Sequence, residues 1–166
     1  MSRITETFAR LRAEGQRALI PFVVAGDPDL EATRDILLTL ARAGADLIEL
    51  GVPFSDPIAD GPINQRAAQR ALANGVSLAD VLALVRKARA DVRQPVVLLS
   101  YYNPILQYGL QRFCADAVQA GVDGVAIPDL PPDESEELLT GARPAGLDTI
   151  FLLAPTSTEE RLRFVA

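Results

Sequence analysis

Apolar runs and helical repeats alternate along this chain of 166 residues, and the alternation limits the folds open to it. The apolar runs are typical of strands buried on both faces, and they occupy residues 18–25, 46–50, 95–100, 122–127 and 149–153. Helical spacing covers residues 2–14, 30–42, 64–72, 78–89, 106–120 and 133–140, with a last helix from Thr158. This order predicts an α/β fold with a parallel sheet and right-handed crossovers.

An internal repeat supports a structure made of similar strand–helix units. Ala-Gly-Ala-Asp at residues 43–46 and Ala-Gly-Val-Asp at 120–123 both stand where a helix leads into a strand. Such units close into an eight-stranded barrel of ~250 residues in many enzymes. Only five strands are predicted here, so the residues alone leave two folds open: a small open sheet, or the N-terminal part of a barrel.

Composition excludes several functions. A net charge of −6 and a pI of about 4.7 argue against nucleic-acid and membrane partners. No apolar run approaches transmembrane length, and no signal peptide is expected. The single cysteine, Cys114, allows no internal disulfide, which predicts a cytoplasmic protein in which this thiol is part of the core. The absence of histidine predicts no metal site, and the only lysine, Lys87, lies on a charged helix face. Acid–base chemistry would therefore fall to carboxylates, helped by tyrosine.

The segment 48–61 is the strongest candidate for a site. It reads Ile-Glu-Leu-Gly-Val-Pro-Phe-Ser-Asp-Pro-Ile-Ala-Asp-Gly and places Glu49 at a strand end and Asp60 in a loop stiffened by proline and glycine. Carboxylates above the carboxyl end of a parallel strand are typical of α/β active sites. Taken alone, the pair could equally be a solvated strand end and a turn.

The full string resembles the signature of the tryptophan synthase alpha subunit family. The match runs without a gap through Glu49, Gly51, Phe54, Ser55, Asp56, Pro57, Asp60 and Gly61. The resemblance continues at residues 26–28, 100–104, 127–131 and 151–156. It implies a (β/α)8 TIM barrel, present here as an incomplete barrel of about five parallel strands. Residues 1–166 would then be one domain, the N-terminal portion, truncated before strands six to eight.

The resemblance implies a lyase of tryptophan biosynthesis that cleaves indole-3-glycerol phosphate to indole and glyceraldehyde 3-phosphate. By resemblance, Glu49 transfers the proton to indole C3, and Asp60 accepts the indole N–H and stabilises the cationic ring. The local sequence fits this division, because an apolar strand favours a protonated Glu49 and a polar loop favours an ionised Asp60. The indole pocket is expected to be lined by Phe22, Leu99, Tyr101 and Leu152, although each could be ordinary core.

The resemblance also implies a partner, the tryptophan synthase beta subunit, in an α2β2 assembly. The contact face is expected to include Pro53, Asp56, Pro57, Asn103 and Pro131. No cofactor is expected in this chain, since pyridoxal phosphate belongs to the beta subunit. The family's phosphate-binding loops and lid follow strand five, so an alternative is a truncated, non-catalytic module that binds the beta subunit. A different phosphate-sugar barrel enzyme, such as an epimerase, does not account for the Glu49 to Asp60 string.

Overall fold

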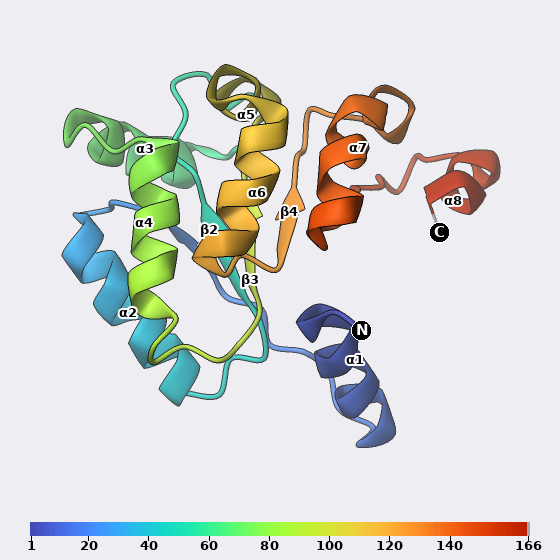
Figure 1. The fold of residues 1–166 in the computed structure, drawn as a ribbon, viewed down its shortest axis with the longest axis horizontal. Helices are drawn as coiled ribbons and strands as arrows, with labels where there is room; N and C mark the ends of the chain where they lie inside the picture. The colour runs from blue at the N-terminus through green and yellow to red at the C-terminus, as the bar shows by residue number, and fades with distance from the viewer. Residues whose placement is uncertain (166) are drawn as a thin grey trace.

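Five parallel strands form one sheet in the computed structural model, which describes residues 1–165 (Figure 1). The strands are β1 (Phe22–Val24), β2 (Ile48–Gly51), β3 (Val96–Leu99), β4 (Gly124–Ala126) and β5 (Asp148–Ile150). Each strand pairs with the next one in the sequence, and every pair is parallel. The predicted alternation of strand and helix is therefore confirmed, with all carboxyl ends of the strands at one edge of the sheet.

Helices connect the strands. They are α1 (Arg3–Ala13), α2 (Leu30–Arg42), α3 (Pro62–Ala73), α4 (Leu78–Ala88), α5 (Tyr102–Tyr108), α6 (Leu110–Ala120), α7 (Glu136–Ala145) and α8 (Glu159–Val165), with a 3-10 turn, η1 (Pro132–Glu134). Helices α2, α4, α6 and α7 lie in a row on one face of the sheet, each in contact with the next (Figure 1). Within residues 1–165, no helix has the length and hydropathy needed to cross a bilayer.

The two faces of the sheet have different cores. The face toward the helices is made of fully buried side chains: Ile48, Leu50, Val96, Leu98 and Val125. Each such side chain stabilises the fold by about 1.5–3 kcal/mol on burial. The opposite face carries a smaller cluster around Val97 and Ala126, and this face also carries Glu49, because successive strand residues point to opposite faces. Cys114 is buried in α6, as predicted.

Helix α1 lies at the amino ends of the strands and leaves the carboxyl ends clear (Figure 1). The repeated Ala-Gly-x-Asp motif explains its position. Arg10 pairs with Asp46 at 2.9 Å, and Arg3 pairs with Asp123 at 2.7 Å, so each copy of the motif binds an arginine of α1. Asp123 also pairs with Arg89, the residue that follows α4. The two copies of the motif therefore hold α1 against the amino ends of the strands, the end of the sheet opposite the candidate site.

The bounds of several predicted segments differ from the structure, and three of these differences have a clear local cause. The run at 18–25 yields only the short strand β1, because Leu19 exchanges backbone and carboxylate hydrogen bonds with Asp46 before the pairing with β2 starts. Gly109, at φ +96°, separates two helices where one helix over 106–120 was predicted, and α5 begins earlier, at Tyr102. Asp133 does not cap a helix. It lies in η1, which closes when Ser135 donates hydrogen bonds to the Pro132 carbonyl, so α7 begins only after Ser135.

Candidate active site

A small hollow lies at the carboxyl ends of β1, β2 and β3, beneath the loop that connects β2 to α3. Its lining comes from these strands, the loop and the first turns of α3: Phe22, Val24, Gly51, Val52, Phe54, Pro57, Asp60, Asn64, Ala68, Leu99 and Tyr101. Its volume is about 20 Å³, room for about one water molecule. Phe22, Leu99, Tyr101 and Asp60, which were predicted to share a site, are brought together here.

Tyr101 holds the loop and orients Asp60. Its hydroxyl oxygen accepts the Ala59 N–H at 2.8 Å, and its hydrogen is donated to Asp60 Oδ2 at 2.9 Å. The side chain of Gln65 adds a bond to the Asp60 carbonyl at 2.9 Å. The Phe54 ring packs against the Tyr101 ring, with centroids 5.3 Å apart. The buried side chain of Tyr101 therefore holds the loop between β2 and α3 in place.

The Tyr101 phenol is a permanent donor at neutral pH. Burial first, and then the bond to Asp60, raise the pKa of Tyr101 to about 12. The residue is only 5% exposed. The sequence predicted Tyr101 as a pocket residue and nothing more. Its bond to Asp60 spans 41 residues, and no local pattern in the sequence indicates it.

Glu49 lies one layer deeper on the same face of β2 and does not line the hollow. Its register partners on the adjacent strands are Phe22 and Val97, both apolar. Its carboxyl is half-buried, and burial raises its pKa above the ordinary value for glutamate. The prediction that its strand would favour the protonated acid is confirmed.

Other predicted residues lie outside the hollow. Leu152 follows β5 and is 56% exposed, so it is not part of the lining. Pro53 is buried, whereas Asp56 and Asn103 are exposed, and Pro57 and Pro131 are half-buried. Asp56 accepts a hydrogen bond from Ser55 at 2.5 Å at the tip of the loop. The exposed part of the predicted contact face is therefore the loop tip and the start of α5.

Asn64 lines the hollow but was not predicted. It lies in the first turn of α3, which begins at Pro62 directly after the Asp60-Gly61 pair. The helix was predicted to begin at residue 64, but proline in the first turn of a helix is a usual start signal, so Pro62 is the signal that could have placed Asn64 one turn from Asp60. Among residues 1–165, no group of three or more His, Cys, Asp or Glu side chains is arranged to hold a metal ion.

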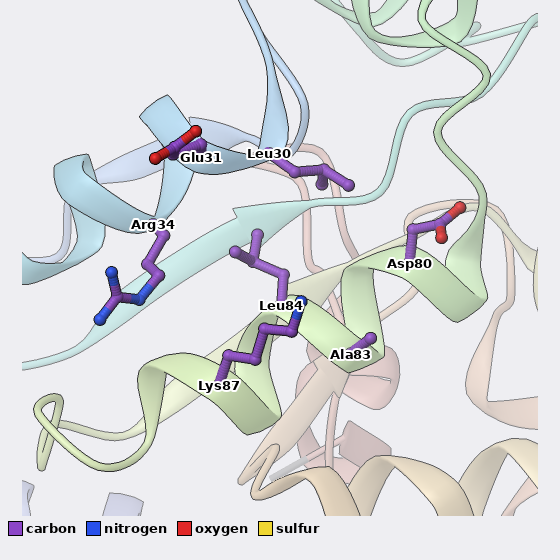
Figure 2. A pocket seen from close by; sticks show the side chains of 7 residues that line it. All are labelled: Leu30, Glu31, Arg34, Asp80, Ala83, Leu84 and Lys87. Atoms are coloured by element: carbon purple, nitrogen blue, oxygen red, sulfur yellow. The ribbon is translucent and has the colours of Figure 1, made fainter.

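A second, larger hollow of about 630 Å³ lies between α2 and α4 (Figure 2). Its lining joins an apolar floor to charged side chains: Leu30, Ala83, Leu84, Glu31, Asp80, Arg34 and Lys87. The two acids and two bases cancel, so the hollow favours neither an anionic nor a cationic ligand. Lys87 is exposed, as predicted for a solvated helix face. This surface lies apart from both candidate acids.

Comparison with known proteins gives a consistent result. The family model described as "Tryptophan synthase alpha chain" matches residues 8–166. A tryptophan synthase alpha chain from Geotalea uraniireducens is 55% identical over 166 residues, which are 100% of this chain and 62% of that protein. One from Methylibium petroleiphilum is 57% identical, over 99% of this chain and 61% of that protein. The chain thus spans about three fifths of the length of these relatives.

Solved structures agree with the sequence relatives. The tryptophan synthase subunit alpha of Legionella pneumophila superposes with a TM-score of 0.96 at 44% identity, over 99% of this chain and 63% of that chain. A chain of the tryptophan synthase complex from Pyrococcus furiosus superposes with a TM-score of 0.85 at 44% identity. That match covers 89% of this chain and 61% of that chain.

Proposed function

Because this chain belongs to the tryptophan synthase alpha chain family, we propose that it carries the two acids that cleave indole-3-glycerol phosphate to indole and glyceraldehyde 3-phosphate. The observation that supports this most directly is the placement of Asp60. It is held by Tyr101 at the edge of an apolar hollow, above a half-buried Glu49 whose pKa is raised. The sheet is that of an incomplete TIM barrel, and we propose that residues 1–166 form a single domain, the N-terminal portion of the barrel.

The proposed reaction is a retro-aldol cleavage in which the substrate's own ring accepts the electrons. Protonated Glu49 gives its proton to indole C3, which makes the ring an indoleninium cation. The bond from C3 to the glycerol carbon then breaks, its electron pair neutralises the ring, and the adjacent hydroxyl loses its proton to the Glu49 carboxylate as the aldehyde forms. Asp60, as an anion, binds the indole N–H and stabilises the cation.

Two environments support this division of roles. Glu49 is desolvated by Phe22 and Val97, which favours the protonated acid that the first step needs. Asp60 lies in the loop beside the hollow, where the hydrogen bond from the Tyr101 hydroxyl holds its carboxyl group in place. Since the hollow holds about one water molecule, side chains at its mouth must move aside when an indole ring enters.

We further propose that the loop tip meets a tryptophan synthase beta subunit. Asp56 and Ile58 are exposed there, and Ile58, which is 84% exposed, offers a partner a large apolar side chain beside a carboxylate. Asn103, at the start of α5, and Pro131, before η1, would extend the contact. The cofactor of the assembly, pyridoxal phosphate, would belong to the beta subunit. The α2β2 stoichiometry and a cytoplasmic location stay predictions.

Indole release from indole-3-glycerol phosphate tests the catalytic proposal. In a complete alpha chain that contains these residues, Glu49→Gln and Asp60→Asn should each lower the rate of indole release by about 10²–10⁴-fold. Glu31→Gln is a matched control, because Glu31 lies in the α2–α4 hollow, apart from the site. Full activity in either site variant would remove that residue from the mechanism. Binding of the beta subunit without any indole release would favour the non-catalytic module.

A further inference from the structure

The Phe22 ring occupies the space that a side chain at residue 51 would need. A Cβ atom built on Gly51 would lie 2.7 Å from Phe22 Cζ and 2.9 Å from Phe22 Cε2. Non-bonded carbon atoms normally lie about 3.5–4.0 Å apart. The next nearest atom, the Val23 carbonyl oxygen, lies at an ordinary 3.6 Å. The ring alone therefore excludes a side chain at this position.

The backbone does not require glycine at residue 51. Gly26 and Gly121 have φ values of +87° and +93°, which L side chains rarely adopt, but Gly51 lies in β2 and is not among the glycines with positive φ. Glycine within a strand weakens the strand and often marks a close approach of another group. Here the close approach is the aromatic ring of the neighbouring strand.

The ring and Gly51 together form one wall of the hollow. Phe22 leans from β1 across Gly51, and Leu99 lies opposite Gly51 on β3 in the sheet register. Asp60 closes the side beneath the loop. A side chain at residue 51 would project into this hollow and push the Phe22 ring off β2, so less space would remain between the residues that line it.

We propose that Gly51 determines which aromatic ring this site accepts, because a residue without a side chain lets Phe22 lie back against β2 and leaves room for a flat two-ring system once the side chains at the mouth of the hollow move aside. This inference rests on the proposed indole chemistry and deepens it. A methyl group at residue 51 would push the ring by about 1 Å to restore a normal contact. A bicyclic ligand should then lose more affinity than a smaller, monocyclic ligand that also carries an N–H donor.

Calorimetric titration with indole and with aniline tests the slot. In Gly51→Ala, the Kd for indole should rise at least tenfold, whereas the Kd for aniline should change less than threefold. The substitution Phe22→Leu removes the two ring atoms that exclude the methyl group. Adding Gly51→Ala to Phe22→Leu should therefore change the indole Kd less than twofold. Gly61→Ala is the matched control, because Gly61 has open space around it and a φ of −74°.

The possible results separate the two proposals. If the unchanged chain does not bind indole, the proposed function is overturned and this inference with it. If the unchanged chain binds indole and Gly51→Ala binds it equally well, only this inference is overturned. If Gly51→Ala causes the same loss in the unchanged chain and in the Phe22→Leu variant, the ring is excluded as the cause. A nuclear Overhauser contact between the Phe22 ring and the Gly51 α-protons, measured without ligand, must also be present in the unchanged chain.

Discussion

Removing one oxygen atom from Tyr101 should loosen the whole loop between β2 and α3. Tyr101→Phe deletes a hydrogen bond from the Ala59 N–H and another to the Asp60 carboxylate. A neutral bond is worth about 0.5–1.5 kcal/mol, and a bond to a charged group about 1.5–3 kcal/mol. Ala59 is exposed and Asp60 half-buried, so water replaces part of each bond and the low ends apply. We expect the free energy of unfolding to fall by about 2 kcal/mol.

Thermal unfolding followed by circular dichroism measures this loss. For a chain of this size, 1 kcal/mol corresponds to a Tm change of about 2–4 °C, so Tyr101→Phe should lower the Tm by about 4–8 °C. Amide hydrogen exchange over residues 56–60 should accelerate at the same time. Tyr102→Phe is the control, because the Tyr102 hydroxyl makes no hydrogen bond within the described part of the chain. An equal Tm loss in both variants, or unchanged exchange in the loop, would refute the reasoning.

The same phenol predicts a loss of stability at high pH. Tyr101 has a pKa of about 12 in the folded protein, and an unfolded tyrosine has a pKa near 10. The unfolded state therefore releases this proton first, and stability should fall as the pH rises from about 10 to about 12. Tyr101→Phe should show a smaller decrease over that interval in urea unfolding measured at several pH values. Parallel curves would show that Tyr101 titrates normally.

Three further predictions concern residues outside the loop. Arg89→Ala leaves the buried Asp123 carboxylate with the half-exposed Arg3 as its one cation and with the Val96 N–H, so the free energy of unfolding measured in urea should fall by about 3 kcal/mol. Arg3→Ala should lower it by less than about 1 kcal/mol, and equal losses would contradict this. Glu49→Gln should raise the free energy of unfolding at pH 7, because the ionised carboxylate is costly to bury and the amide carries no charge. This gain in stability should vanish below about pH 4, where glutamate is protonated in both states, and a gain that does not change with pH would exclude ionisation as the cause. Ser77→Ala should lower the free energy of unfolding by about 1 kcal/mol, because Ser77 forms both halves of a capping box, and no change would mean that water replaces the cap.

The order of the elements followed from patterns that act within a few residues. Alternating apolar runs and helical spacing predicted the parallel sheet, and the spacing of leucine and isoleucine predicted α2 with its observed bounds. The strands were predicted too long, since pairing depends on the neighbouring strand and not on the apolar run itself. Leu19 shows this: it is apolar and adjacent to β1, but its backbone binds Asp46.

The candidate site could be predicted only where local sequence sets the environment. The apolar neighbours of Glu49 along the chain indicated the burial that raises its pKa, and the structure agrees. The bond between Tyr101 and Asp60 depends on how a loop folds back onto β3, and neither residue's neighbours report it. Leu152 failed to reach the hollow for a similar reason: β5 ends at Ile150, so the apolar run continues past the strand into exposed chain.

The two proposed catalytic carboxyls differ because the chain presents them in different ways. Strand alternation turns Glu49 toward the apolar inner face of the sheet, where the structure offers its carboxyl no hydrogen bond among residues 1–165 and burial alone sets its pKa. The loop carries Asp60 to the strand ends, where a phenol that stays protonated donates to it. A proton donor needs the first environment and an anion that stabilises a cation needs the second. The double exchange Glu49→Asp with Asp60→Glu should therefore abolish indole release, although both carboxyl groups are kept. Aspartate at residue 49 would be too short to reach C3 of the indole ring. Glutamate at residue 60 would lose its hydrogen bond from Tyr101.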